Sequence, residues 1–142
     1  MRRISNKSDK IMLRTAYDIA AKSPANRLKV GAVIRSIYRR VVASGYNHPC
    51  KSKGDKCEDE NNVTYPYVIH AEQEAICSAE SKGYTIKGAT MYVTAAPCVA
   101  CANLIIASGI NRVVYSDDYR DMQGVDLLRE NGVKVEKFNF KE

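Results

Sequence analysis

The chain has 142 residues, which is the length of one ordinary domain and enough to bury a hydrophobic core without disulfides. Hydrophobic residues make up 45% of it and charged residues 27%, values that exclude a collagen-like or intrinsically disordered chain. The formal net charge of +6 favours an anionic partner, such as a nucleotide phosphate or a nucleic acid.

The first part of the chain predicts a helix, a β-hairpin and a long loop. Apolar residues recur on one face at helical spacing over 8–22, which predicts the helix, with Ser8 at its start. Two β-branched runs at 30–34 and 40–46, separated by a polar turn, predict the hairpin. Residues 47–62 are mixed and polar without periodicity, so we expect a loop there, and this loop could hold metal.

The second part of the chain predicts alternating helices and strands. Helices are expected at 70–82, 98–108 and 121–131, and strands at 89–94, 112–115 and 133–138. Each of these helices is followed or closed by a glycine, the residue that most readily adopts the left-handed cap conformation. The pattern predicts an α/β fold with a five-stranded mixed sheet covered by helices on both faces, in a single domain of residues 1–142.

The cysteines and the apolar runs indicate the cellular compartment of the protein. Residues 1–10 are mostly polar and charged, and no apolar run approaches the roughly 18 residues of a membrane span. We therefore expect a soluble cytoplasmic protein with no membrane partner. Five cysteines, an odd number, are then better interpreted as thiols or metal ligands than as a disulfide framework.

Lysine and arginine are spread along the chain in small clusters, at Arg2-Arg3, Arg39-Arg40 and 51–56. A polynucleotide-binding protein would need a denser basic face interleaved with aromatic residues. A solvated surface that confers solubility is therefore the favoured interpretation, and nucleic acid is not the partner that we expect.

Two short motifs carry the chemistry of the chain. One of its two histidines begins His70-Ala71-Glu72, and Pro97-Cys98-Val99-Ala100-Cys101 follows, with two thiols on one face of a predicted helix start. One histidine and two cysteines make three zinc ligands, and catalytic zinc keeps three protein ligands and leaves the fourth position to water. Both motifs lie at predicted helix N-termini, where the helix dipole favours a thiolate.

Glu72 is the candidate general base and acid. Zinc lowers the pKa of a water that it binds, and a nearby carboxylate can take the proton and return it to the substrate. The order His-x-Glu followed by Pro-Cys-x-x-Cys matches that of zinc deaminases. Taken alone, the cysteines could be a redox pair or half of a structural zinc site, and Glu72 could be a solvated helix residue.

With these motifs in place, the chain resembles the deoxycytidylate (dCMP) deaminase branch of the cytidine deaminase superfamily over most of its length. The segments that resemble the family are 30–34, 45–47, 65–72, 88–94 and 97–101, in family order. The resemblance implies a three-layer cytidine-deaminase-like fold, one catalytic Zn²⁺, a homo-oligomer that is often a hexamer, and dCTP and dTTP as allosteric effectors. The aromatic run before His70 is closer to dCMP deaminases than to tRNA adenosine deaminases.

The resemblance also implies substrate contacts. Asn47 matches the family asparagine that contacts the sugar and base, and the backbone N–H of Ala71 would hold the pyrimidine oxygen. Lys29 and Tyr119 stand where the family places phosphate or sugar contacts, although a surface lysine and a packed tyrosine explain them equally well. Tyr67 could stack on the base, or it could belong to the core.

The sequence departs from the family pattern in two places. Where the family continues with asparagine and alanine after the glutamate, this chain has Gln73-Glu74-Ala75; Glu74 needs a hydrogen-bond donor, for which Lys29, Arg27 or the substrate are candidates. The loop carries His48, Cys50 and Cys57, which resemble the second, structural zinc site of some members. A fourth ligand is not obvious, although Asp55, Glu58 or Asp59 could complete the set. Cys77 is expected to be a buried small hydrophobic residue.

The function expected from these features is hydrolysis of dCMP to dUMP and ammonia, which supplies dUMP for thymidylate synthesis. Three alternatives remain open. The substrate could be dCTP or a 5-substituted dCMP, or a base held in RNA or single-stranded DNA. Outside the enzyme class, the chain could be a binding module in which zinc only stabilises the fold.

Overall fold

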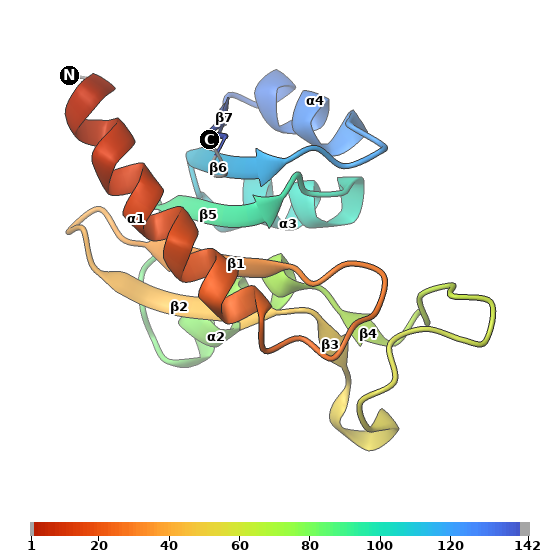
Figure 1. Cartoon of the computed structure of the whole chain (residues 1–142). Coiled ribbons are helices and arrows are strands. Elements are labelled where there is room, and N and C mark those ends of the chain that lie inside the picture. The colour runs from red at the N-terminus through yellow and green to blue at the C-terminus, as the bar shows by residue number, and fades with distance from the viewer. Residues whose placement is uncertain (1, 140–142) are drawn as a thin grey trace.

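The computed structural model describes residues 2–139, with side chains from residue 7 onward (Figure 1). Its helices are α1 (Arg2–Ala20), α2 (Ala71–Ser81), α3 (Val99–Ser108) and α4 (Gln123–Glu130), with a short 3-10 turn, η1, at Lys51–Lys53. Its strands are β1 (Gly31–Arg35), β2 (Val41–Tyr46), β3 (His48–Pro49), β4 (Val68–Ile69), β5 (Thr90–Ala95), β6 (Arg112–Asp117) and β7 (Lys134–Lys137). No helix within residues 2–139 has the length and apolarity needed to cross a membrane.

The central sheet has five strands in the order β2-β1-β5-β6-β7. The hairpin partner β2 and the central strand β5 both pair antiparallel with β1, whereas β5, β6 and β7 run parallel to one another. The predicted mixed sheet of five strands is confirmed. Because the parallel strands share one direction, their carboxyl ends meet at one edge of the sheet.

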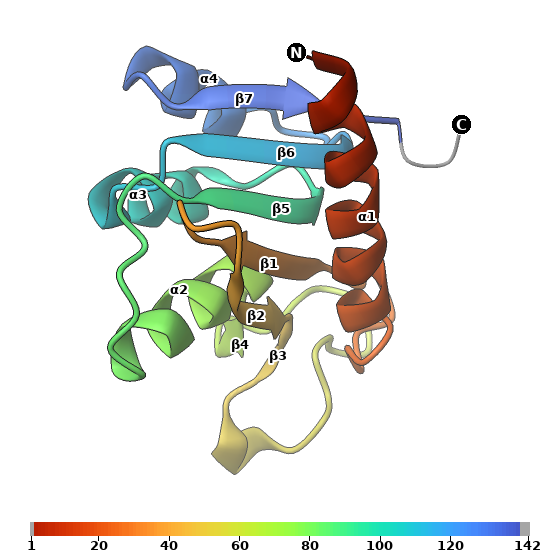
Figure 2. The ribbon, with the colours of Figure 1, turned by 90° about the vertical axis from the view of Figure 1, so that its left-hand side faces the viewer.

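Helices cover the two faces of this sheet unequally, as Figure 2 shows: α1 lies alone on one face, and α2, α3 and α4 lie on the other. Strand residues alternate between the two sides, as the pleat requires. In β1, Val33 joins Leu13 of α1 in one cluster, while Ile34 packs in the larger cluster under the other three helices. The predicted covering of both faces is confirmed.

Helix α1 begins earlier than the sequence predicts, at Arg2 instead of near Ser8. The hydroxyl of Ser8 does not cap a helix start, because it accepts a hydrogen bond of 2.7 Å from the Arg35 guanidinium of β1. Nearly two turns of helix therefore precede the predicted start. The buried Asp9 then fixes α1 to the sheet through Arg112 (2.7 Å) and the Tyr92 hydroxyl (2.8 Å).

Residues 47–62 were expected to be loop, but they contribute β3 to a small second sheet whose other strand, β4, follows that segment. Strands β3 and β4 pair antiparallel, with His48 opposite Ile69 and Pro49 opposite Val68. Two-residue strands leave no periodic signature in a sequence, so the pattern could not reveal them. The small sheet ties the end of β2 to the start of α2, which places Asn47 beside His70 in space.

Close packing of β2 against α2 depends on Gly45. A Cβ atom at this position would lie 2.5 Å from the carbonyl oxygen of Ala71 and 2.8 Å from the backbone nitrogen of Ala75. Both atoms belong to the backbone of a helix and cannot move aside. Glycine therefore allows α2, which begins directly after His70, to lie against the sheet.

We expect Gly45→Ala to lower the free energy of unfolding by about 1–3 kcal/mol, because the added methyl group must displace α2. Thermal and urea unfolding measure this effect. Ser44→Ala, on the neighbouring half-buried residue, is the matched control and should change stability by less than about 0.5 kcal/mol. Equal unfolding midpoints for the two variants would show that the helix has room to move.

Candidate active site

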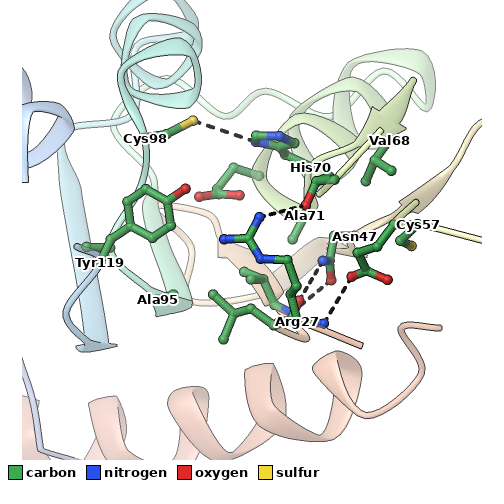
Figure 3. Close-up of a pocket in the computed structure, with 15 residues that line it drawn as sticks. Arg27, Asn47, Cys57, Val68, His70, Ala71, Ala95, Cys98 and Tyr119 are labelled. Atoms are coloured by element: carbon green, nitrogen blue, oxygen red, sulfur yellow. Dashed lines mark hydrogen bonds between the residues drawn. The ribbon is translucent and has the colours of Figure 1, made fainter. Parts of the chain in front are cut away.

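An open pocket lies where β5 ends, between the starts of α2 and α3 (Figure 3). Its volume is about 700 Å³, counting the space at its mouth that is continuous with solvent. The lining residues are Arg27, Leu28, Val30, Asn47, Cys57, Glu58, Thr64, Val68, His70, Ala71, Glu72, Ala95, Ala96, Cys98 and Tyr119. Ligands of open α/β sheets bind in such crevices at the carboxyl ends of the strands.

Three candidate metal ligands converge at the inner end of this pocket. Cys98 and Cys101 place their Sγ atoms 3.6 Å and 3.3 Å from His70 Nδ1, and the three ligand atoms all lie within 4.8 Å of one another. His70 is the N-cap of α2, and Cys98 is the N-cap of α3. The two predicted helix starts are thus brought together by the fold.

This donor set fits zinc. One imidazole nitrogen and two thiol sulfurs suit a borderline-soft cation that prefers tetrahedral coordination, and they leave one position for a fourth ligand. Within residues 7–139, His70, Cys98 and Cys101 form the one group of three histidine, cysteine or acidic side chains close enough to share an ion. We expect these three side chains to hold the zinc.

The pKa values of the two thiols are shifted in opposite directions. A hydrogen bond from the Cys101 thiol and a second from His70 lower the pKa of Cys98 to about 4. The same bond to Cys98, together with burial, raises the pKa of Cys101. The hydrogen bond to Cys98 also raises the pKa of His70. Since cysteine binds zinc as the thiolate, metal binding here is coupled to loss of the remaining protons.

Glu72 lies beside this cluster and is 5% exposed. Burial raises the pKa of its carboxyl group to about 7, although its own backbone N–H, His70 and the Cys101 thiol act in the opposite direction. A carboxyl group with this pKa can both accept and donate a proton near neutral pH. Its position and its raised pKa suit a general acid and base, and this catalytic role of Glu72 stays a prediction.

The start of α3 is braced from outside by α4. A Cβ atom on Gly124 would collide with the carbonyl oxygen of Pro97 and with the backbone carbonyl of Cys98. A glycine is therefore needed where α4 passes the thiol loop. This close approach fixes the backbone that carries Cys98.

The predicted substrate contacts divide into two groups. Asn47, Ala71 and Tyr119 line the pocket. The side chain of Asn47 also supports the pocket wall, because its Oδ1 accepts the N–H of Val30 and its Nδ2 donates to the carbonyl of Leu28, both at 2.8 Å. Direct contact of these three residues with a substrate stays a prediction.

Lys29 and Tyr67 do not line the pocket. The ammonium group of Lys29 donates a 2.8 Å hydrogen bond to the carbonyl of Ser23. The ring of Tyr67 stacks on Tyr65 with 4.8 Å between centroids, and the ammonium group of Lys53 lies over it at 5.2 Å. Their side chains are thus engaged elsewhere in the fold.

Glu74 finds its donors on β2 and β3, and the expectation of Lys29 or Arg27 as partner was wrong. Its Oε1 accepts the N–H of Tyr46 at 3.1 Å, and its Oε2 lies 2.8 Å from Nε2 of His48. Glu74 therefore fastens α2 to the chain on both sides of Asn47. The sequence contained the partner, but only the pairing of β3 with β4 brings it within reach.

The loop residues His48, Cys50 and Cys57 do not form a metal cluster in the described part of the chain. Both ring nitrogens of His48 have other partners, since Nδ1 lies 2.8 Å from the carbonyl oxygen of Pro49 and Nε2 contacts Glu74. Cys57 is buried with Ala25 and Val68 in a small apolar cluster. The prediction of a second zinc gains no support from this arrangement.

Cys77 was expected to be buried and is exposed. The residues of α2 that face the core are Ala71, Glu72, Ala75, Ile76 and Ala79. Each residue of an α-helix is rotated by about 100° from the one before it. Position 77 therefore lies on the opposite side of α2 from this buried face. The general tendency of cysteine to be buried was a weaker guide here than the helical face.

Sequence reasoning did not place three polar residues in the pocket wall, namely Arg27, Glu58 and Thr64. Arg27 was expected only as a partner of Glu74, and Glu58 only as a possible ligand of a metal in the loop. Glu58 is 4% exposed, whereas the other acids of the loop, Asp55, Asp59 and Glu60, are not buried. No periodicity distinguishes one acid from the next in an irregular loop. Burial of Glu58 follows from the path of the loop, which the sequence pattern does not define.

Comparison with known proteins agrees with this geometry. Residues 6–117 match the family model of the cytidine and deoxycytidylate deaminase zinc-binding region. This chain belongs to that deaminase family. The deaminase is 35% identical to ComE operon protein 2 of Bacillus subtilis, over 87% of its own length and 67% of that protein, and 34% identical to mouse deoxycytidylate deaminase, over 91% and 78%.

A solved structure is also similar to this deaminase. The dCMP deaminase of cyanophage S-TIM5, in complex with dCMP and dUMP, superposes with a TM-score of 0.89 at 32% identity, and the match covers 93% of this chain and 97% of that one. The cytidine-deaminase-like fold class predicted from the sequence is confirmed. The chain is a zinc-dependent deaminase, a hydrolase that acts on C–N bonds.

We expect the purified deaminase to contain about one equivalent of zinc, because the described residues form one open cluster of three ligands. Cys98→Ala and Cys101→Ala should each lose it, as measured by elemental analysis of the folded protein. Cys50→Ser is the matched control in the loop and should keep the wild-type content. A fall from two equivalents to one in Cys50→Ser would instead establish a second zinc in the loop.

The contact between His48 and Glu74 should make stability depend on pH. Burial lowers the pKa of His48, but hydrogen bonds to Glu74 and to the Pro49 carbonyl outweigh this effect and leave the pKa above its ordinary value. Because the pKa of His48 is higher in the folded than in the unfolded protein, the ion pair stabilises the fold fully below the unfolded pKa of about 6.5. This stabilisation is lost as the pH rises through the pKa of the folded protein.

A double-mutant cycle with His48→Ala and Glu74→Ala measures this contribution by urea unfolding. We expect a larger coupling energy near pH 5.5 than near pH 8.5, since His48 is protonated only at the lower pH. Zinc content should be the same in all four proteins, which separates the effect from metal loss. A coupling energy that does not change with pH would mean that His48 binds Glu74 as the neutral imidazole.

Proposed function

We propose that this chain hydrolyses dCMP to dUMP and ammonia and thereby supplies dUMP for thymidylate synthesis. The observation that carries the proposal is the buried Glu72 beside the His70, Cys98 and Cys101 cluster in an open pocket. The relatives named deoxycytidylate deaminase, and the similar cyanophage enzyme bound to dCMP and dUMP, support the choice of nucleotide.

The residues of the pocket have different roles in the reaction. His70, Cys98 and Cys101 hold zinc, which when bound supplies an activated water as nucleophile. Glu72 takes one proton of that water at its carboxylate and delivers it to the ring nitrogen, and it then takes the second proton of the same water and delivers it to the amine, which leaves as ammonia. The backbone N–H of Ala71 holds the pyrimidine oxygen at the start of α2, where the helix dipole favours a negative partner.

The alternatives differ from this proposal in what the pocket must accept. A base in RNA or single-stranded DNA would have to be flipped into the same pocket and would need a basic channel for the flanking strand. A binding module with structural zinc would normally close the metal with a fourth protein ligand. A buried acid beside the metal would also have no role in such a module. An enzyme that acts on a free nucleotide is therefore favoured over both alternatives.

The proposal includes three finer expectations. We infer that dCTP and dTTP act as allosteric effectors, that the chain assembles as a homo-oligomer with a hexamer favoured, and that it works in the cytoplasm on free nucleotides. Activity titrations with dCTP and dTTP test whether they are effectors, and light scattering measures the oligomeric state.

The test is to incubate the zinc-loaded protein with dCMP, dCTP, 5-methyl-dCMP, deoxycytidine and an adenosine-bearing RNA stem-loop, and to follow base conversion. We expect dCMP to have the highest kcat/KM. Glu72→Gln should keep zinc and lose about 10²–10⁴-fold in kcat, because proton transfer is removed while the ligands remain. Conversion of the stem-loop but not of dCMP, or near-normal turnover by Glu72→Gln, would refute the proposal.

A further inference from the structure

A second cavity lies at the edge of the sheet opposite to the active site. It opens between α1, the turn that joins β1 to β2, and the first residues of β5 and β6. Its volume is about 550 Å³, counting the space that is continuous with solvent. Thr90, the first residue of β5, lines this cavity, whereas Ala95, the last residue, lines the active-site pocket. The length of β5 therefore separates the two sites by roughly 17 Å.

Three guanidinium groups line the cavity, which we call the arginine cavity after Arg35, Arg39 and Arg112. Arg35 pairs with Thr90 across β1 and β5, and Thr90 pairs with Arg112 across β5 and β6. Residues paired in this way direct their side chains to the same face of a sheet, which here is the face that α1 covers. Like charges so close together repel one another unless acids neutralise them. The nearby carboxylates therefore decide the charge of the cavity.

Of these three groups, the guanidinium of Arg112 is neutralised. Its Nη1 and Nη2 donate to the two carboxylate oxygens of Asp9 at 3.1 and 2.7 Å, and its Nε donates to Glu136 at 2.9 Å. Asp9 is the one acid among the described residues that line the cavity, and its carboxylate also accepts the Tyr92 hydroxyl at 2.8 Å. The carboxylates that reach this edge of the sheet are thus engaged by Arg112.

The charge of Arg35 is held in place but is not neutralised. Its Nη1 donates to the hydroxyl of Ser8 at 2.7 Å, and its Nη2 donates to the hydroxyl of Tyr92 at 3.2 Å. Both partners are uncharged, and within residues 7–139 no carboxylate forms an ion pair with Arg35. A guanidinium has five N–H donors, so three donors of Arg35 are left for a ligand.

The turn between β1 and β2 brings a second uncompensated cation, Arg39, to the cavity. The turn is closed by Ser36, whose carbonyl accepts the N–H of Arg39 at 2.9 Å, and the φ angle of Arg39 is 63°. Glycine adopts this left-handed conformation without strain, whereas a residue with a Cβ atom does not. The geometry of the turn therefore does not call for arginine. Among the described residues, no acid pairs with the Arg39 guanidinium either.

We propose that the arginine cavity binds the phosphate group of a small molecule between Arg35 and Arg39. Two uncompensated guanidinium groups match a phosphate, which carries close to two negative charges at neutral pH, and their planar forks match its oxygens. Thr90 adds a hydroxyl from the same wall. The cavity is large enough to hold more than the phosphate itself. Binding here is independent of the reaction at Glu72.

Calorimetry at constant ionic strength gives the Kd of inorganic phosphate, pyrophosphate and ribose 5-phosphate for the zinc-loaded protein. Tighter binding of ribose 5-phosphate than of inorganic phosphate would identify a phosphate ester as the ligand, and the reverse order would identify the free ion. Hydrogen exchange followed by mass spectrometry locates the site, since residues 35–41 and 88–90 should exchange more slowly with pyrophosphate bound. Protection confined to the active-site pocket, or no binding of any of the three, would overturn the proposal.

Arg35→Gln should weaken pyrophosphate binding by about 10- to 100-fold, because its charge-assisted bonds are lost while the amide can still reach Ser8. Arg39→Gly should weaken binding at least about fivefold without lowering the unfolding temperature, since glycine suits the turn. Arg40→Ala removes an exposed charge next to Arg39 but outside the cavity wall, and it is the matched control. Equal affinities of Arg39→Gly and Arg40→Ala would mean that net charge alone attracts the anion.

Two further measurements separate this site from other phosphate binders. Arg27→Ala changes the active-site pocket and should leave the protection of residues 35–41 by pyrophosphate unchanged. A single-stranded DNA of 12 nucleotides should bind no more tightly than pyrophosphate, because a polynucleotide needs a continuous groove along its backbone. Tighter binding of this DNA that Arg35→Gln also weakens would make the cavity part of a nucleic-acid surface and would refute the small-molecule assignment.

Discussion

The structure depends on one constraint, which is the meeting of two helix N-termini at the carboxyl edge of the sheet. His70 and Cys98 are the caps of α2 and α3, and the fold must bring these two caps within ligand distance of each other. Loops alone would hold such side chains loosely. The parallel strand β5 leads into α3, and β2 packs against α2 through Gly45, so the rigid sheet sets the distance between the caps.

Much of this arrangement could be predicted because it is local. The motif from His70 to Glu72 and the motif from Cys98 to Cys101 each lie within one helical turn, where spacing along the sequence is spacing in space. The strands of the large sheet and the three helices after residue 70 also carry their own periodic signals. These elements agree with the sequence prediction to within a few residues.

The parts that could not be predicted are the non-local polar contacts. Glu74 appeared to need a donor, but its partner His48 is 26 positions away and is brought close by two-residue strands that leave no pattern. Arg27 and Lys29 are both cations in one irregular segment, and nothing in their spacing tells which of them turns to the pocket. Such choices are made by buried acceptors such as Glu58, which accepts the backbone N–H of Arg27 and whose burial is a property of the whole fold.

The glycine at position 124 has a consequence for how the molecule opens. The matched family region ends at residue 117, yet α4 beyond it touches the backbone of Pro97 and Cys98 without any side chain between them. Because the backbone of α4 is in direct contact with that of Pro97 and Cys98, the two segments separate in the same unfolding event. Fluctuations that release the C-terminal helix would therefore loosen the thiol loop, so the slowest amide exchange of α3 and the retention of zinc should belong to one cooperative unit of unfolding.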